Sequence, residues 1–240
     1  MNETGRRANS HGVSRLDRSG VSAQADQMLR IDIYSDTVCP WCYIGKRRLE
    51  RAIASRSELQ VEISWRAFQL NPNMPTSGVL WANYLATKFG APERAESVFA
   101  AITRAGHSER IAFDFAAISQ MPNTVQSHRL LRFAERFGRQ DTMMETLFRA
   151  YFLDGEDIGD IETLARVAAV CGLDGLAAMA FLEGDEERNA VLSEDKRARR
   201  MGINAAPCYI VNGAYALSGA QEPEAFYPLF DLAEVAIGAE

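Results

Sequence analysis

Two cysteines separated by only two residues, Cys39-Pro40-Trp41-Cys42, constrain the fold of this chain more than any other feature. The apolar residues of the stretch before them, 29–35, alternate with polar ones as in a strand, whereas the residues after them follow a helical pattern. At a helix start this spacing brings the two sulfurs together, and the free N–H groups of the first turn stabilise a thiolate. We therefore predict a redox-active dithiol in which Cys39 is exposed and has a lowered pKa, and in which Cys42 is more buried.

The order of predicted elements indicates the fold class. Residues 29–35, 41–55 and 61–68 predict a strand, a helix and a second strand, which is a parallel βαβ unit with the dithiol at the end of its first strand. Strand character returns after a long helical stretch, around an Asn212-Gly213 turn that is a strong hairpin signal, and Pro223 opens a last helix. The sequence thus predicts an α/β thioredoxin fold (βαβ…ββα) with a large all-helical insertion domain. Its expected helices are 80–89, 93–105, 124–137, 141–152, 161–171, 173–182 and 186–200.

Composition changes along the chain set the expected domain boundaries. Residues 1–27 are rich in Ser, Asn, Gly and Arg and lack the apolar segment of a secretory signal, so we expect a flexible tail and a cytoplasmic protein. Residues 28–78 and 202–240 form the expected thioredoxin-fold domain, and 79–201 form the insertion.

Charge and hydropathy exclude several kinds of partner. The formal net charge of −6 argues against bulk attraction to nucleic acid or an anionic membrane, and charged residues interrupt every apolar run before it could span a bilayer. The basic run Lys46-Arg47-Arg48 is expected to be a solvated helix face, and exposed apolar helix faces are compatible with a homodimer. Cys171 and Cys208 stand alone in the sequence and are expected to be small buried hydrophobic residues.

Several segments together resemble one known family. The stretch 35–45 around the dithiol resembles the active-site segment of the DsbA-like thioredoxin superfamily, in particular its FrnE-like branch, which is related to DSBA oxidoreductases and 2-hydroxychromene-2-carboxylate isomerases. Further matching segments are 68–72, 123–124 with 128–130, 202–207 and 218–221. The resemblance extends from about residue 29 to the C-terminus and is more specific than the dithiol motif alone.

The resemblance implies a thiol–disulfide oxidoreductase that acts on protein or small-thiol disulfides. Cys39 would attack and Cys42 would resolve the mixed disulfide, while Pro207 would be a cis-proline that faces the dithiol and turns the backbone of Ala206 toward a substrate chain. No tightly bound cofactor is implied, but glutathione is a plausible redox partner or ligand. The expected substrate-binding residues are Pro40, Trp41, Asn71, His128, Ala206, Gly219 and Gln221.

One position departs from the family pattern. Many thioredoxin-like proteins carry a buried acid beneath the dithiol that shuttles a proton to the second cysteine, and Ile33 occupies that position here. Two interpretations of the nearby Asp36 stay open: it partly substitutes for that acid, or it ends the strand or caps a turn.

Three other functions remain as alternatives. The dithiol could be half of a zinc site that Cys171, Cys208 or a histidine completes. The chain could be a glutathione-dependent isomerase or transferase of the kappa-class or hydroxychromene-carboxylate type, although those relatives carry Ser where Cys39 stands. Finally, the helical insertion could form a chaperone-like binding groove without enzymatic activity.

Overall fold

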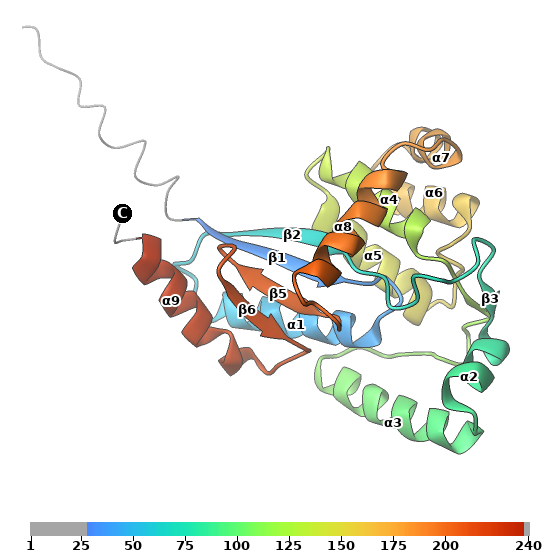
Figure 1. Ribbon diagram of the computed structural model, residues 1–240, viewed down its shortest axis with the longest axis horizontal. Helices are drawn as coiled ribbons and strands as arrows, with labels where there is room; N and C mark the ends of the chain where they lie inside the picture. The colour runs from blue at the N-terminus through green and yellow to red at the C-terminus, as the bar shows by residue number, and fades with distance from the viewer. Residues whose placement is uncertain (1–27, 238–240) are drawn as a thin grey trace, which may run out of the picture.

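The computed structural model describes residues 28–237, with side chains to residue 233. The tail predicted for residues 1–27 and the last three residues lie outside the described residues. The helices and strands closely follow the order that the sequence predicts (Figure 1).

A four-stranded mixed sheet is the centre of the fold. The strands β1 (Leu29–Ser35), β2 (Val61–Ala67), β5 (Cys208–Val211) and β6 (Tyr215–Ser218) lie in the order β2-β1-β5-β6. β1 pairs with β2 in parallel, and the other neighbours are antiparallel, as the predicted βαβ unit and hairpin require. The predicted thioredoxin fold is therefore confirmed.

Helices cover both faces of this sheet. On one face, Ile31, Ile33 and Tyr209 belong to the main core, which also contains buried side chains of α1 (Pro40–Ala54) and α9 (Tyr227–Ile237). A short 3₁₀ helix, η1 (Pro223–Ala225), precedes α9. The alternate strand residues face the other way, where Tyr34 and Cys208 pack with Phe68, Ala198 and Ile203. Leu29, Ile31 and Ile33 of β1 are buried in the main core, whereas Arg30 and Asp32 on the other face are exposed or half-buried, and this difference explains the alternating pattern of the strand.

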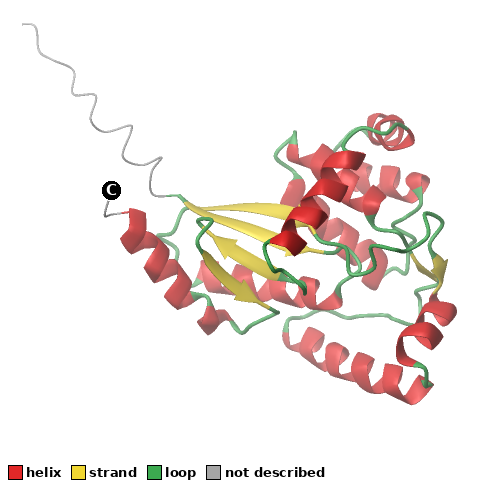
Figure 2. Cartoon of the chain, viewed as in Figure 1, coloured by secondary structure: helices red, strands yellow, loops and turns green. Residues whose placement is uncertain are grey.

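The insertion is helical apart from one short strand pair. Its helices are α2 (Trp81–Phe89), α3 (Pro92–Ser108), α4 (Val125–Glu135), α5 (Gln140–Phe152), α6 (Ile161–Val170), α7 (Gly175–Glu183) and α8 (Arg188–Arg200) (Figure 2). The strands β3 (Val79–Leu80) and β4 (Gln120–Met121) form a two-stranded sheet that the all-helical prediction did not include. Strands of two residues are too short to produce a recognisable alternation.

Side chains of the insertion cover the edge of the sheet that β2 forms. The Gln140 amide accepts a hydrogen bond from the Trp65 backbone N–H at 2.8 Å and donates to the Trp65 carbonyl at 3.1 Å. Glu194 of α8 accepts from the Ala67 N–H at 2.7 Å. These bonds satisfy edge groups of β2 that would otherwise pair with another chain, and they hold the insertion against the sheet. None of the helices in the described part of the chain is both long and apolar enough to cross a membrane.

Candidate active site

The dithiol lies where β1 passes into α1. Cys39 is the N-cap residue of α1, Pro40 is in its first turn, and the Cys42 backbone N–H donates a hydrogen bond to the Cys39 sulfur at 3.3 Å. Proline suits this position because a first-turn N–H has no helical partner. The first turn contains no acidic side chain, so the positive end of the helix acts on the Cys39 sulfur without opposition from its own turn.

Both sulfurs are covered, which corrects one prediction. The exposed fraction is 2% for Cys39 and 1% for Cys42, so the expected exposed attacking sulfur is wrong for this conformation. Burial, followed by the neighbouring Cys42, raises the pKa of the Cys39 thiol, and the Cys42 N–H bond only opposes this shift. The predicted lowered pKa is therefore not found while the sulfur is covered, because desolvation of the anion outweighs one hydrogen bond. Trp41, in contrast, is 38% exposed beside the pair.

The loop before β5 faces the dithiol. The Ala206–Pro207 peptide bond is cis, as the family resemblance implies. The Cys39 thiol donates to the Ala206 carbonyl oxygen at 3.7 Å, and Pro207 is buried. The Gly219 N–H donates to the Pro207 carbonyl at 2.8 Å, which joins the start of the loop after β6 to this segment. Cys39, Ala206, Pro207 and Gly219 thus lie in one continuous set of contacts.

A buried pair joins the active-site loop to the insertion. The Asp36 carboxylate lies 3.3 Å from Nε2 of His128 on α4, and both side chains are at most 2% exposed. The hydroxyls of their chain neighbours Thr37 and Ser127 are hydrogen-bonded to each other at 2.7 Å. His128 therefore contacts the loop beside the dithiol rather than lying open in a cleft. Asp36 has a partner that neither of its two sequence interpretations included.

Two further residues were predicted to bind substrate, Asn71 and Gln221. Asn71 lines a groove of about 650 Å³ between the loop after β2 and α2, and neither cysteine contributes to the lining of that groove. Gln221 is exposed, and its side chain donates to the Ser218 carbonyl at 2.9 Å. Their proposed contacts with glutathione remain predictions.

The basic run on α1 is not a solvated face at Lys46 or at Arg48. The Lys46 side chain is 4% exposed and pairs with Glu50, Asp141 (3.1 Å) and Glu145 (3.8 Å). Arg48 pairs with Glu109 at 3.0 Å. The prediction is wrong for these residues because α5 and the end of α3 bring acids to this side of α1, which the local sequence does not reveal.

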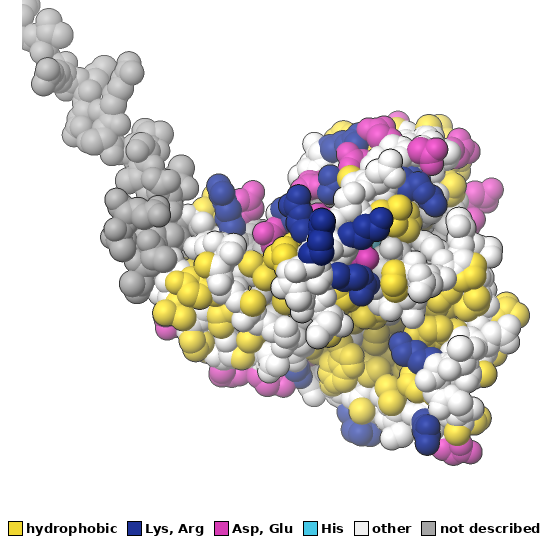
Figure 3. All heavy atoms as spheres, in the orientation of Figure 1, with side chains coloured by type: hydrophobic (Ala, Val, Ile, Leu, Met, Phe, Trp, Pro, Cys, Tyr) yellow, Lys and Arg dark blue, Asp and Glu magenta, His cyan; other side chains and the backbone are white. Residues whose placement is uncertain are grey.

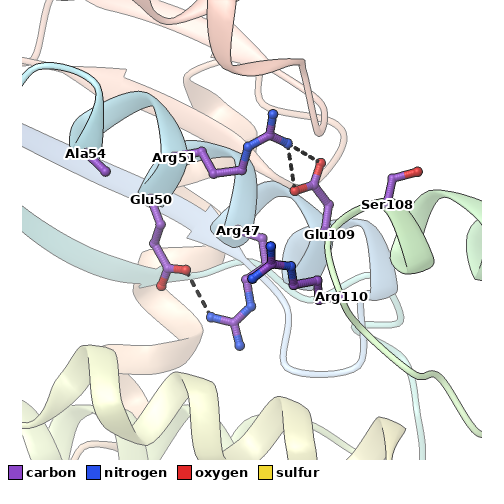
Figure 4. Close-up of a pocket in the computed structure, with 7 residues that line it drawn as sticks. All are labelled: Arg47, Glu50, Arg51, Ala54, Ser108, Glu109 and Arg110. Atoms are coloured by element: carbon purple, nitrogen blue, oxygen red, sulfur yellow. Dashed lines mark hydrogen bonds and ion pairs between the residues drawn. The ribbon is translucent and has the colours of Figure 1, made fainter.

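A charged hollow of about 820 Å³ lies on this outer side of α1 and does not include the dithiol. Figure 4 shows the Arg51 guanidinium facing the Glu109 carboxylate, to which it donates two hydrogen bonds at 3.0 Å. Arg47 pairs with Glu50 at 2.9 Å in the same hollow. These charges satisfy one another, so we assign the hollow no part in the dithiol chemistry.

The lone cysteines do not join the pair. Cys171 and Cys208 are buried, as predicted, and Cys171 donates to Thr146 Oγ1 of α5 at 3.1 Å. Among residues 28–233, no three His, Cys, Asp or Glu side chains are grouped so that they could hold a metal ion.

A two-cysteine helix start facing a cis-proline loop, on a thioredoxin fold, defines a thioredoxin-like dithiol protein. The family model for the DSBA-like thioredoxin domain matches residues 30–229, and the chain belongs to this family.

Comparisons with individual proteins agree with this family assignment. The uncharacterized protein YwbO of Bacillus subtilis (strain 168) is 27% identical over 214 residues, which cover 82% of this chain and 94% of that protein. The crystal structure of a probable DsbA oxidoreductase from Streptomyces coelicolor is 29% identical, with a TM-score of 0.75, and the match covers 88% of this chain and 91% of that one.

Two more distant structures share the fold alone. A 2-hydroxychromene-2-carboxylate isomerase is 17% identical with a TM-score of 0.61, over 88% of this chain and 95% of that one. The cytosolic disulfide reductase DsbM of Pseudomonas aeruginosa is 17% identical with a TM-score of 0.56, over 88% of this chain and 97% of that one. DsbM has also been solved with GSH.

Sequence reasoning missed one polar group at the site. The Tyr209 hydroxyl is buried on the face of the sheet that α1 covers. Its position follows from strand register, since Tyr209 pairs with Ile33. In the sequence, the only sign of this buried hydroxyl is the position of Tyr209, two residues after Pro207 in a strand whose residues alternate.

Proposed function

We propose that this chain is a thiol–disulfide oxidoreductase in which Cys39 attacks a substrate disulfide and Cys42 resolves the mixed disulfide. The observation that carries this proposal is the position of the Cys39 sulfur at the N-cap of α1, where the Cys42 N–H donates to it at 3.3 Å. A helix N-terminus stabilises a thiolate, and the thiolate is the form that attacks disulfides. The Cys42 side chain lies in the same first turn, within reach of any bond that Cys39 forms.

The attack requires that Cys39 be uncovered first. Cys39 is 2% exposed and its sulfur lies 3.7 Å from the Ala206 carbonyl, so a substrate sulfur reaches it only when the Ala206 segment or another neighbouring group moves. Uncovering removes the desolvation, which is the largest cause of the raised Cys39 pKa, while the Cys42 N–H bond continues to stabilise the thiolate. Substrate binding and activation of the nucleophile are thereby coupled.

The reaction transfers two electrons. The Cys39 thiolate attacks one sulfur of the substrate disulfide, that S–S bond breaks, and the leaving sulfur takes up a proton from solvent. Cys42 loses its proton to solvent and attacks the Cys39 sulfur, so that the mixed disulfide breaks and the second substrate sulfur is released. The dithiol is then oxidised and the substrate is reduced; the reverse sequence oxidises a client dithiol.

The surface beside the dithiol favours an apolar client. Trp41, within the dithiol motif, is 38% exposed, and Leu70, whose N–H donates to Asp36 of the active-site loop, is 37% exposed. Figure 3 shows apolar side chains gathered between the first turn of α1 and α3. Such a surface suits an extended protein segment around a disulfide. Glutathione is the second proposed partner, because Gly219 lies in direct contact with the Pro207 segment and DsbM, a fold relative, has been solved with GSH.

Turnover assays of cysteine variants test the proposal. Reduction of insulin and oxidative refolding of a reduced client should both fall to the uncatalysed rate in Cys39→Ala and in Cys42→Ala. Cys171→Ala, which removes a buried thiol elsewhere, should retain activity. A glutathione-dependent isomerase would not need Cys42, so full activity of Cys42→Ala would overturn the two-cysteine mechanism.

A further inference from the structure

Tyr209 presents a buried hydroxyl without a hydrogen-bond partner beneath the dithiol. The residue is 1% exposed, and within the described part of the chain its hydroxyl oxygen makes no hydrogen bond. A buried polar group of this kind is costly, whereas a phenylalanine ring of the same shape would avoid the cost. Packing alone therefore does not explain the hydroxyl, because the ring already packs edge-on against Phe226 with centroids 4.9 Å apart.

The hydroxyl lies against the first turns of α1. A methyl group added to Gly45 would collide with the Tyr209 oxygen and would lie 3.1 Å from Cγ of Pro207. Gly45 follows Cys42 by three residues, so the two lie one above the other on the same helix face. The Tyr209 hydroxyl and Pro207 therefore both lie against Gly45, on the helix face that also carries the resolving cysteine.

The strand register places Tyr209 beside Ile33. Ile33 occupies the strand position at which many thioredoxin-like proteins carry a buried acid. Tyr209 of β5 is the direct partner of Ile33 of β1. Directly paired residues of an antiparallel ladder point to the same face of the sheet. The polar group that is missing from β1 is therefore present on β5.

We propose that Tyr209 is a positioning residue for the resolving step and that its hydroxyl donates a hydrogen bond to the Cys42 sulfur when that sulfur is ionised. This role rests on the proposed function and deepens it. Tyr209 keeps its own proton throughout: the Cys42 proton leaves to solvent, the Cys42 sulfur attacks the Cys39 sulfur, and the substrate thiolate departs. The hydrogen bond stabilises the negative charge before the new S–S bond forms.

The surrounding groups are consistent with a donor that stays protonated. Burial, followed by Cys42 and then Cys39, raises the pKa of Tyr209 well above its ordinary value. Arg48 of α1 opposes this shift, and Cys208 of the same strand adds slightly to it. Arg48 is itself engaged by the Ala220 carbonyl at 2.6 Å and by Glu109 at 3.0 Å.

The remaining ionisable groups near the dithiol belong to the active-site loop, to α4 and to α1. They include Asp36 and His128, which pair with each other; on α1 itself Tyr43 and Lys46 follow Cys42 and both contact Glu145. Any pH dependence of the resolving step must therefore be compared between variants that leave these groups and Arg48 intact.

The experiment compares Tyr209→Phe with Tyr34→Phe, which removes a hydroxyl from the opposite face of the sheet. In a Cys39→Ser background, alkylation of Cys42 by iodoacetamide is followed against pH by peptide mass spectrometry. We expect Tyr209→Phe to move the profile to higher pH and to slow alkylation about tenfold at pH 8, as loss of a charge-assisted hydrogen bond would. Tyr34→Phe should match the parent, and identical profiles for Tyr209→Phe and the parent would overturn the proposal.

A second readout follows the resolving step itself. With both cysteines present, the mixed disulfide with a small aromatic disulfide should decay about tenfold more slowly at pH 8 in Tyr209→Phe, while its formation is unchanged. Equal decay in the two proteins would contradict the role of Tyr209. If the wild type catalyses no exchange at all, the proposed function fails, but the alkylation profile still decides whether Tyr209 acts on Cys42.

Discussion

The Asp36 carboxylate and the His128 imidazole face each other at 3.3 Å, and both are buried where the active-site loop meets α4. The same carboxylate accepts a hydrogen bond from the Leu70 N–H at 2.7 Å. Asp36 therefore ties three segments together only three residues before Cys39. This arrangement makes the insertion part of the support of the dithiol rather than a separate appendage.

Replacing Asp36 should loosen this junction. In Asp36→Ala, the Leu70 N–H and His128 lose their buried partner, and we expect a loss of about 2–4 kcal/mol in the free energy of unfolding, measured by urea titration. Asp36→Asn keeps an acceptor oxygen at the same place and should lose clearly less. Equal stability of the Ala variant and the wild type would show that the pair does not hold the loop.

A second prediction concerns the contact between Gly45 and Tyr209. Alanine is normally favoured over glycine in a helix, but here its methyl group collides with the Tyr209 hydroxyl. We expect Gly45→Ala to lower the free energy of unfolding by about 1–3 kcal/mol, as overpacking does. In a Tyr209→Phe background the same substitution should cost much less, since the colliding oxygen is gone. If the two substitutions lower the free energy of unfolding additively in the double variant, the Tyr209 hydroxyl does not lie against Gly45.

The third prediction is a pH dependence of stability caused by Tyr43. Burial and the Glu145 carboxylate, 2.9 Å from the Tyr43 hydroxyl, raise the Tyr43 pKa from 10.0 to about 12. Tyr43 ionises at a lower pH in the unfolded state than in the folded state. The contribution of Tyr43 to the free energy of unfolding is therefore complete below pH 10 and is lost as the pH rises toward 12. The stability of wild type relative to Tyr43→Phe should thus fall by about 1–2 kcal/mol between pH 9 and pH 11.5 in urea titrations. A difference that stays constant with pH would contradict the shift.

Local patterns predicted the elements of the fold well. The strand expected at 29–35 is Leu29–Ser35, because its first residues are buried on one face of the sheet and polar and less buried on the other, which produces a clear two-residue period. The turn at Asn212-Gly213 adopts positive φ angles of 48° and 68°, as its residue types require. The β3–β4 pair was missed because two residues carry no periodicity.

The site was predicted in part. The positions of Cys39 and Cys42 at the start of α1 and the cis bond before Pro207 agree with the sequence expectations. The covered state of Cys39 and the burial of Lys46 were not predicted, because both depend on residues more than 90 positions away, at Ala206 and Asp141. Long-range packing of this kind leaves no local signal.

The most direct test of the account is to trap the mixed disulfide and map it. Cys42→Ser should form a long-lived adduct with a peptide disulfide, and mass spectrometry of the digested adduct should place the peptide on Cys39. Cys39→Ser should form little adduct under the same conditions, because the remaining sulfur at Cys42 is buried one turn further into the helix. Attachment of the peptide mainly to Cys42 in the wild type and in Cys39→Ser, with none on Cys39 in Cys42→Ser, would contradict the assigned roles of the two cysteines.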